Sequence, residues 1–184
     1  VPLDEEFNIP LEELKKENGG VILPNPNAPT GKYIDTDKLK ELLEANKDTV
    51  VIIDEAYIDF GGESMVKYIK DYKNLLVVQT FSKSRSLAGG RIGFALGDKE
   101  LIEGLNRVKN SINSYTIDKV ALNAGKAAIE DKEYFEETRN KIIKTRENVI
   151  KTLREMGFKV LDSKANFVFA SHKDFEGQYL YEEL

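Results

Sequence analysis

Lys83 stands in the stretch of this sequence that is best suited to chemistry, Q-T-F-S-K-S-R-S-L-A-G-G-R-I-G. Two hydroxyl residues, Thr80 and Ser82, precede the lysine, and Arg91 follows it. Arginine holds a phosphate dianion through bidentate, charge-assisted hydrogen bonds, and hydroxyl groups can add further donors. A lysine amine beside such an anion can form a Schiff base with an aldehyde. Taken alone, Lys83 fits a solvated basic loop better, so the interpretation depends on what else the chain supplies.

Asp54 directly follows the apolar, β-branched run V-V-I-I, which predicts a strand buried on both faces of a parallel sheet. One interpretation is a Walker B carboxylate that holds Mg²⁺, and another is a carboxylate that faces a protonated ring nitrogen. The first needs a P-loop, but around the pair Gly31-Lys32, Pro26 replaces the first glycine and Tyr33 the Ser or Thr. The sequence therefore argues against a nucleotide hydrolase, whereas a structural role for Asp54, such as capping a loop, stays open.

A third stretch, P-N-P-N-A-P-T-G over residues 24–31, follows the short apolar run V-I-L. Its three prolines and its glycine impose a rigid, irregular backbone. By itself this stretch is an ordinary turn, and it acquires meaning only beside the other two.

The elements that must position these stretches alternate between strand and helix patterns. Such alternation predicts an α/β fold, in which ligands bind beyond the carboxyl ends of the strands. The three stretches follow predicted strands and are therefore the loops expected to carry function. The predicted strands cover 21–23, 50–53, 75–78, 91–96, 158–161 and 167–170, and the predicted helices 9–17, 35–45, 64–70, 101–108, 117–130, 132–156 and 178–184.

Composition removes several classes of function. The 184 residues carry a net charge of −5, which disfavours a mainly electrostatic nucleic-acid binder. No apolar run approaches the ~20 residues of a membrane-spanning helix, and the acidic start of the chain is unlike a signal peptide. The absence of cysteine excludes disulfides, thiolate metal sites and cysteine nucleophiles, and we expect no metal. The only histidine, His172, disfavours a Ser-His-Asp triad and is expected at the surface.

Four stretches together carry a specific resemblance. They are P-N-A-P-T-G (Pro26 to Gly31), V-V-I-I-D-E-A-Y-I-D-F (Val50 to Phe60), T-F-S-K-S-R-S-L-A-G-G-R-I-G (Thr80 to Gly93) and S-K-A-N-F-V (Ser163 to Val168). With them the chain resembles the fold-type I, class I/II aminotransferases that depend on pyridoxal 5'-phosphate. The resemblance implies a three-layer α/β large domain with a mostly parallel sheet in residues 1–131. Residues 132–184 would form a long connecting helix and the truncated start of a small α+β domain.

The resemblance also implies catalytic roles for three residues. Lys83 would bind the cofactor covalently and later carry a proton to and from the substrate carbon. Asp54 would pair with the pyridinium nitrogen and keep it protonated, so that the ring acts as an electron sink. Tyr57 would hydrogen-bond the 3′ oxygen of the ring.

Other positions would bind the cofactor phosphate or the substrate. The resemblance gives Thr80, Ser82 and Arg91 to the phosphate, and Asn166 to the substrate carboxylate. One position departs from the family, which usually has Asn where this chain has Ala28. The contact of that Asn with the 3′ oxygen would fall to Tyr57 alone, or to Asn27 or Asn25 from a shifted loop. Losing one neutral hydrogen bond costs about 0.5–1.5 kcal/mol, which a cofactor held covalently and by its phosphate tolerates.

The stretch D-E-A-Y-I-D-F-G-G-E-S (Asp54 to Ser64) favours the histidinol-phosphate branch of this family. That branch implies amino-group exchange between histidinol phosphate and 2-oxoglutarate in histidine biosynthesis. The parent would be a cytoplasmic homodimer with small-molecule substrates and no nucleic-acid or membrane partner. The alternatives are another class I/II enzyme, such as an aromatic aminotransferase or a threonine-phosphate decarboxylase, and a catalytically silent fragment.

The resemblance further implies that the chain is a fragment. Four family features are not found: a glycine-containing phosphate-binding helix, an aromatic residue stacked on the ring, a tyrosine lent by a second subunit and a C-terminal arginine that clamps the substrate. The arginines in range are expected on solvated helix faces or as packing stems. They are Arg107, Arg139, Arg146 and Arg154.

Overall fold

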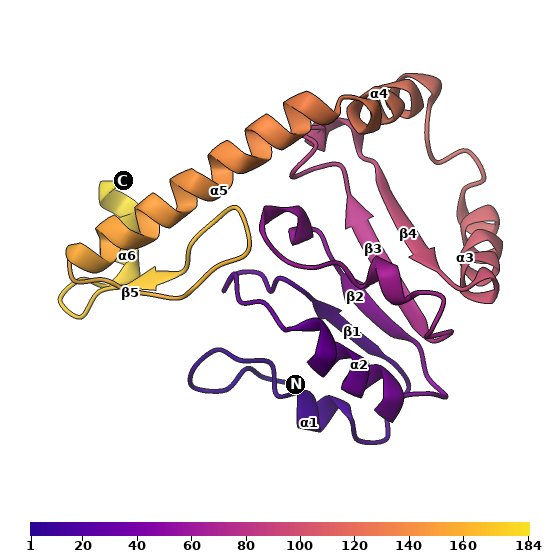
Figure 1. Ribbon diagram of the computed structural model, residues 1–184, viewed down its shortest axis with the longest axis horizontal. Helices are drawn as coiled ribbons and strands as arrows, with labels where there is room; N and C mark the ends of the chain where they lie inside the picture. The colour runs from indigo at the N-terminus through magenta and orange to yellow at the C-terminus, as the bar shows by residue number, and fades with distance from the viewer.

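The computed structural model describes all 184 residues and contains a four-stranded sheet in the order β1-β2-β3-β4. The strands are β1 (Val21–Pro24), β2 (Val51–Asp54), β3 (Leu75–Thr80) and β4 (Gly93–Gly97). The first three are parallel, which confirms the predicted α/β fold with a mostly parallel sheet. β4 runs antiparallel to β3, and the connection between them, residues 81–92, contains no crossover helix of the kind that usually joins parallel strands (Figure 1).

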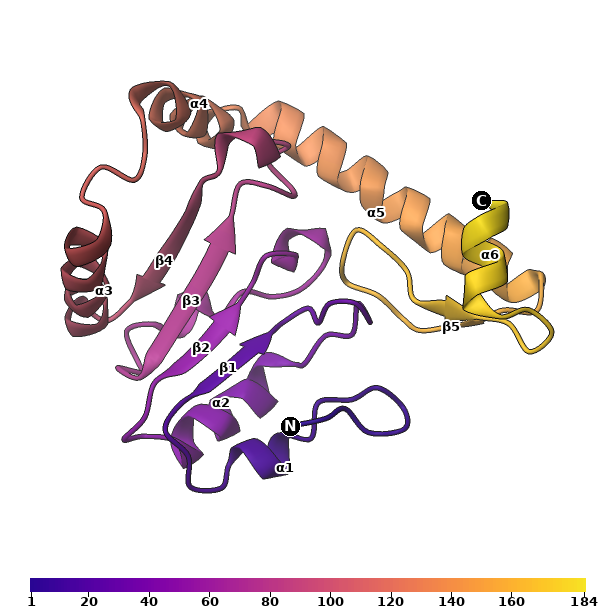
Figure 2. The ribbon, with the colours of Figure 1, turned by 180° about the vertical axis from the view of Figure 1, so that it is seen from behind.

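One face of the sheet carries the hydrophobic core. The helix α2 (Thr36–Ala45) buries Leu39, Leu42 and Leu43 completely against alternate residues of β1, β2 and β3. The short helix α1 (Leu11–Leu14) packs beside it and is shorter than the predicted 9–17 at both ends. It begins later because Pro10 disfavours helical backbone in the residue before it. On the opposite face Ile22 is 74% exposed and no helix crosses the strands (Figure 2). The resemblance implies three layers, and this chain supplies two of them: the sheet and the helical layer on one of its faces.

Short 3₁₀ turns connect the strands to their loops. They are η1 (Ile58–Phe60), η2 (Met65–Tyr68) and η3 (Ala88–Gly90). The turn η2 replaces the helix predicted over 64–70, and it begins where the Ser64 hydroxyl accepts a hydrogen bond from the amide of Val66.

The second half of the chain is mostly helical. It contains α3 (Lys99–Ile112), α4 (Lys119–Glu130), the long α5 (Lys132–Glu155) and α6 (Gly177–Glu183). Each of the first three begins at an aspartate whose side chain accepts a hydrogen bond from an amide of the first turn. The two C-terminal strands are shorter than predicted, and β5 (Lys159–Val160) pairs antiparallel with β6 (Ala170–Ser171). The proposed domain division lies at Asp131, between α4 and α5.

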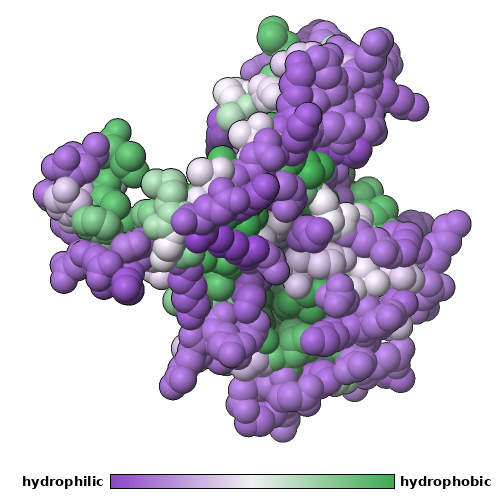
Figure 3. All heavy atoms as spheres, turned by 60° about the vertical axis from the view of Figure 1, so that its left-hand side comes forward, coloured by the Kyte–Doolittle hydropathy of each residue, from purple (hydrophilic) through white to green (hydrophobic).

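The long helix α5 reaches from the β3–β4 side of the sheet to the C-terminal hairpin (Figure 1). The face of the molecule seen in Figure 3 is mainly hydrophilic and is interrupted by apolar patches. No helix has both the length and the apolar character that crossing a membrane requires.

His172 was predicted to lie at the surface, but its side chain is largely covered in the structure. Its side chain is only 10% exposed and lies between the rings of Phe158 and Phe175, at centroid distances of 4.9 and 5.0 Å. The prediction was wrong because the β5–β6 hairpin and the following turn bring these two aromatic rings together around the imidazole.

Candidate active site

The carboxyl ends of the three parallel strands meet at one edge of the sheet. Pro24 of β1 is aligned with Asp54 of β2, which is aligned with Val78 of β3. The amide of Asn25 donates to the carbonyl oxygen of Asp54 at 2.8 Å, so the proline-rich loop starts directly beside the aspartate. The sheet register therefore places the three sequence stretches next to one another, as predicted.

Lys83 and Tyr57 come together at this edge. The Nζ of Lys83 lies 5.2 Å from the centroid of the Tyr57 ring, within the range of a cation–π contact. Asp54 is half-buried, and its Oδ1 accepts a hydrogen bond from the amide of Ala56 at 3.0 Å. This contact matches the structural cap role, but it uses only one carboxylate oxygen. The other oxygen is left for a ligand.

The hydroxyl groups of Thr80 and Ser82 form a pair at the end of β3. The Oγ1 of Thr80 donates to the Oγ of Ser82 at 3.0 Å and accepts from the Ser82 amide at 3.1 Å. Arg91 lies opposite them, because the Phe81 amide donates to the Ile92 carbonyl at 3.1 Å. The guanidinium is exposed and donates to Ala88 O at 3.1 Å. Arg91 also has a left-handed backbone (φ 51°), a conformation that is costly for a side-chain-bearing residue and concentrates at functional sites.

The two asparagines suggested as replacements at Ala28 are both engaged within their own loop. The amide group of Asn25 is fully buried and bonds both the amide and the carbonyl of Ile34, at 2.7 and 3.0 Å. The Oδ1 of Asn27 accepts from the Thr30 hydroxyl at 2.7 Å. Asn27 also lines a hollow of about 150 Å³ together with Phe7 and Lys32. Asn25 therefore has no free group for a ligand, and Asn27 would have to offer its remaining amide nitrogen.

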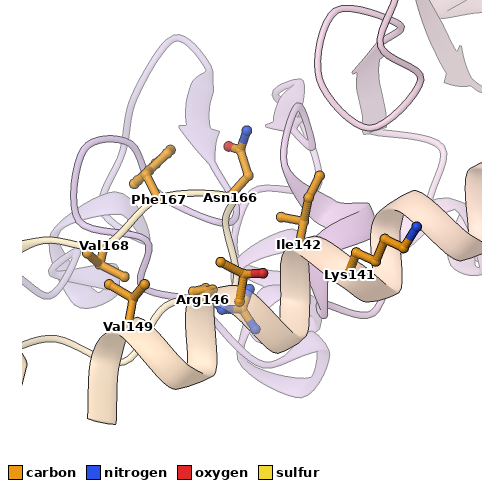
Figure 4. A pocket seen from close by; sticks show the side chains of 8 residues that line it. Lys141, Ile142, Arg146, Val149, Asn166, Phe167 and Val168 are labelled. Atoms are coloured by element: carbon orange, nitrogen blue, oxygen red, sulfur yellow. The ribbon is translucent and has the colours of Figure 1, made fainter. Parts of the chain in front are cut away.

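Asn166 lies on the segment that runs alongside α5. Its amide points away from that helix, at the border of an open cavity of about 350 Å³ (Figure 4). The next residue, Phe167, packs edge-on against the Tyr57 ring with centroids 5.0 Å apart. The tertiary structure thus brings this distant stretch of the sequence to the turn that carries Tyr57.

The sequence suggested that Arg146 lies on a solvated helix face or packs through its aliphatic part. In the structure it is instead buried and hydrogen-bonds two separate loops. Its side chain is 4% exposed, and its Nη1 donates to the carbonyl oxygens of Phe60 and Ala165, each at 2.8 Å. Glu147 balances the charge at 2.7 Å. The prediction failed because helix periodicity cannot show that two loops cover this position of α5. The arginine ties the turn after Tyr57 to the segment that carries Asn166.

Glu55 is a residue that the sequence reasoning did not single out. It is buried, and its carboxylate accepts hydrogen bonds from Ser64 Oγ, the Met65 amide and Gln79 Nε2, at 2.6, 2.6 and 2.8 Å. Burial raises the pKa of Glu55, and the three donors only partly oppose this. The sequence contained part of the information needed to predict this burial. Side chains alternate along a strand, so the side chain next to Asp54 is expected to point to the opposite face of the sheet.

The charged groups of this edge form no ion pairs within the chain. Lys83, Asp54 and Arg91 take part in none of its ion pairs, which join other residues. The loops at this edge therefore offer an amine, a carboxylate, a phenol, two hydroxyls and a guanidinium. This donor set fits a ring that carries an aldehyde, a basic nitrogen and a phosphate. No group of three or more His, Asp or Glu side chains is placed to hold a metal ion.

Comparison with known proteins identifies the family. The model of the family "Aminotransferase class I and II" matches residues 3–184. The chain belongs to this family. It is 71% identical over all 184 residues to the histidinol-phosphate aminotransferase of Clostridium beijerinckii, of which it covers 51%. The chain thus spans about half the length of the curated relatives that it matches.

Solved structures agree with this assignment. The crystal structure of the histidinol-phosphate aminotransferase from Clostridium acetobutylicum matches with a TM-score of 0.89 and 31% identity, over 98% of this chain and 56% of that one. The Sinorhizobium meliloti enzyme, solved in complex with pyridoxal-5'-phosphate, matches with a TM-score of 0.83 and 26% identity, over 94% of this chain and 48% of that one. The expected aminotransferase fold is confirmed.

Proposed function

We propose that the full-length protein is a pyridoxal-phosphate-dependent aminotransferase that exchanges an amino group between histidinol phosphate and 2-oxoglutarate in histidine biosynthesis. The observation that carries the proposal is the approach of Lys83 to Tyr57 at the strand edge, with Asp54 and Arg91 free of ion pairs. The 71% identity to a histidinol-phosphate aminotransferase supports the substrate. We further propose a cytoplasmic homodimer whose partners are small molecules.

The residues of this chain would divide the work as follows. Asp54 holds a proton on the ring nitrogen, and Tyr57 donates its hydroxyl proton to the 3′ oxygen. The hydroxyls of Thr80 and Ser82 and the guanidinium of Arg91 bind the phosphate. Lys83 anchors the cofactor and later, as a free amine, moves a proton at the substrate carbon. Asn166 orients the substrate carboxylate. When bound, the cofactor supplies the electron sink for the carbanion that forms.

Lys83→Ala in the full-length protein tests the assignment. Because the lysine amine is the covalent anchor, the variant should lose the visible chromophore that borohydride reduces. Lys73→Ala, which changes an exposed lysine away from the edge, is the matched control and should keep the chromophore. A chromophore that survives unchanged in Lys83→Ala would show that Lys83 is not the anchor.

Substrate choice needs a separate measurement. The full-length protein should turn over histidinol phosphate at least ten times more efficiently than phenylalanine or threonine phosphate, measured as kcat/KM. A preference for phenylalanine would assign an aromatic aminotransferase, and release of CO₂ from threonine phosphate a decarboxylase. Titration of the 184-residue chain with pyridoxal phosphate decides whether this piece is catalytically silent.

A further inference from the structure

The Lys83 amine has no hydrogen-bond or ion-pair partner within the chain, and its side chain is exposed. A lysine has four rotatable side-chain bonds, so an amine without a partner can reach several positions, and the backbone sets which positions those are. What fixes the backbone around Lys83 therefore decides how the amine meets Tyr57 and Asp54.

The residue after the lysine, Ser84, is bonded to the turn that carries Tyr57. Its Oγ donates to Oδ2 of Asp59, which lies in η1. Ser84 is 6% exposed, so its hydroxyl depends on this partner, because a buried hydroxyl without one is costly. A single side-chain bond thus joins the lysine loop to the tyrosine turn across the strand edge.

A second carboxylate acts in the same way on the other side of Lys83. Glu55 accepts from Gln79, the residue before Thr80 at the end of β3. Glu55 and Asp59 flank Tyr57 in the sequence, and their partners Gln79 and Ser84 flank Lys83. The two bonds thus connect the segment around Tyr57 to the segment around Lys83 at two points.

The lysine loop has further supports that do not involve the tyrosine turn. The guanidinium of Arg85 stacks on Phe135 at 3.5 Å and donates to the carbonyl of Ala128 at 3.1 Å. The loop therefore stays folded when the Asp59 bond is removed. What changes is its registration against Tyr57.

We propose that Asp59 is a positioning residue, which holds Ser84 and thereby fixes the Lys83 amine against Tyr57 and Asp54. This inference rests on the proposed function. It assigns to Asp59 no contact with cofactor or substrate, and it gives the second aspartate of D-E-A-Y-I-D-F a role, which the family resemblance had not done.

The test uses the full-length protein loaded with pyridoxal phosphate, in the variants Asp59→Ala, Asp59→Asn, Ser84→Ala and Asp59→Ala with Ser84→Ala. Asp48→Ala, which removes an exposed aspartate just before β2, at the opposite end of that strand from Asp54, is the matched control. The readouts are kcat, KM and the pH midpoint of the visible absorbance change of the bound cofactor. This midpoint reports the position of the lysine relative to the ring, which a purely structural loss would not move.

Asp59→Ala and Ser84→Ala should each keep the borohydride-reducible chromophore, lower kcat about 10- to 100-fold and shift the midpoint by about half a pH unit or more. Asp59→Asn should keep kcat and the pH midpoint close to their wild-type values, because its amide oxygen can still accept a hydrogen bond from Ser84. The double variant should be no worse than either single one, since both remove the same bond.

An unchanged kcat and midpoint, with only a lower Tm, would overturn the inference, and so would losses that multiply in the double variant. If Asp59→Ala does not fold, Ser84→Ala and Asp59→Asn decide the question. A wild-type protein without a chromophore would refute the proposed function, whereas a normal chromophore that is unaffected by these variants refutes only the role of Asp59.

Discussion

Residues 1–97 bury most of their apolar side chains, whereas the helices that follow leave many of theirs exposed. The ten residues of the main core all lie between Val21 and Val77. In contrast, α3 buries no residue, and in α4 only Gly125 is buried. Val108, Val120 and Leu122 are each more than half exposed. The sheet half therefore carries the hydrophobic stabilisation, and the helical half depends on a few specific contacts.

Those few contacts connect the halves at the candidate site. Arg146 bonds the turn after Tyr57. The Lys164 amide donates to the carbonyl oxygen of Gly31 at 2.8 Å, and Phe167 packs on Tyr57. All lie on the edge where the parallel strands end. The comparison thus teaches that one half builds the site, while the other is fastened to it by polar and aromatic contacts.

Leu42→Ala should cause the largest loss of stability in this comparison. The side chain is fully buried, so the change removes apolar burial and leaves a cavity, and the free energy of unfolding should fall by about 3–5 kcal/mol. The matched change Leu122→Ala, at a leucine that is 62% exposed, should cost no more than about 0.5 kcal/mol. Urea unfolding of the 184-residue chain measures both. Equal losses would break the contrast between the halves.

Arg146→Ala should follow, with a loss of about 3 kcal/mol. The variant leaves the carbonyl oxygens of Phe60 and Ala165 without their shared, charged donor in a buried site. Thermal unfolding of the full-length protein measures the effect. Arg107→Ala removes an exposed arginine of α3 that pairs only with Glu103, and its Tm should hardly change. If Arg146→Ala left the Tm unchanged, other contacts than those of Arg146 would have to hold the two halves together.

Gly31→Ala should cost about 2 kcal/mol and should loosen the same junction. Gly31 has a φ of 74°, and an added Cβ would lie 2.3 Å from Oγ of Ser163, so both the backbone and the neighbouring segment must shift. Gly19→Ala is the control, because nothing lies within 4 Å of its Cβ position. In the full-length protein, amide hydrogen exchange should accelerate at residues 163–168. Unchanged exchange there would contradict the proposed coupling.

Glu55→Gln should have the smallest effect, about 1 kcal/mol, and a recognisable dependence on pH. Burial raises the pKa of Glu55 above its ordinary 4.5, so the folded state holds this proton more tightly than the unfolded state. Between pH 4.5 and the raised pKa, the free energy of unfolding therefore decreases as the pH rises, and below 4.5 the contribution is complete.

The Gln variant cannot titrate, so its stability should fall less steeply than that of the wild type above pH 4.5. Urea unfolding at a series of pH values measures the slope. Parallel curves for Glu55→Gln and the wild type would show that Glu55 does not titrate in this range.

Local patterns were sufficient for much of the sheet half. The apolar runs gave β1, β2 and β3, the spacing of Leu39, Leu42 and Leu43 gave α2, and strand-end logic placed Asp54 at the edge. These features depend on residues close together in the chain. The roles of the site residues and the division at 131/132 remain predictions.

Other outcomes required contacts that no local pattern contains. The sequence could not show that Arg146 lies under two loops, or that His172 lies between two aromatic rings. Nor could it show that the side-chain amide of Asn25 hydrogen-bonds the backbone of Ile34, because this bond joins two sides of an irregular loop.

The sequence by itself determined which groups could do the chemistry and which strands present them, because side-chain type and apolar periodicity are local properties. Only the tertiary structure decided how Lys83 is held against Tyr57. The bonds from Ser84 to Asp59 and from Gln79 to Glu55 join residues far apart in the sequence, which the pairing of β2 with β3 brings together.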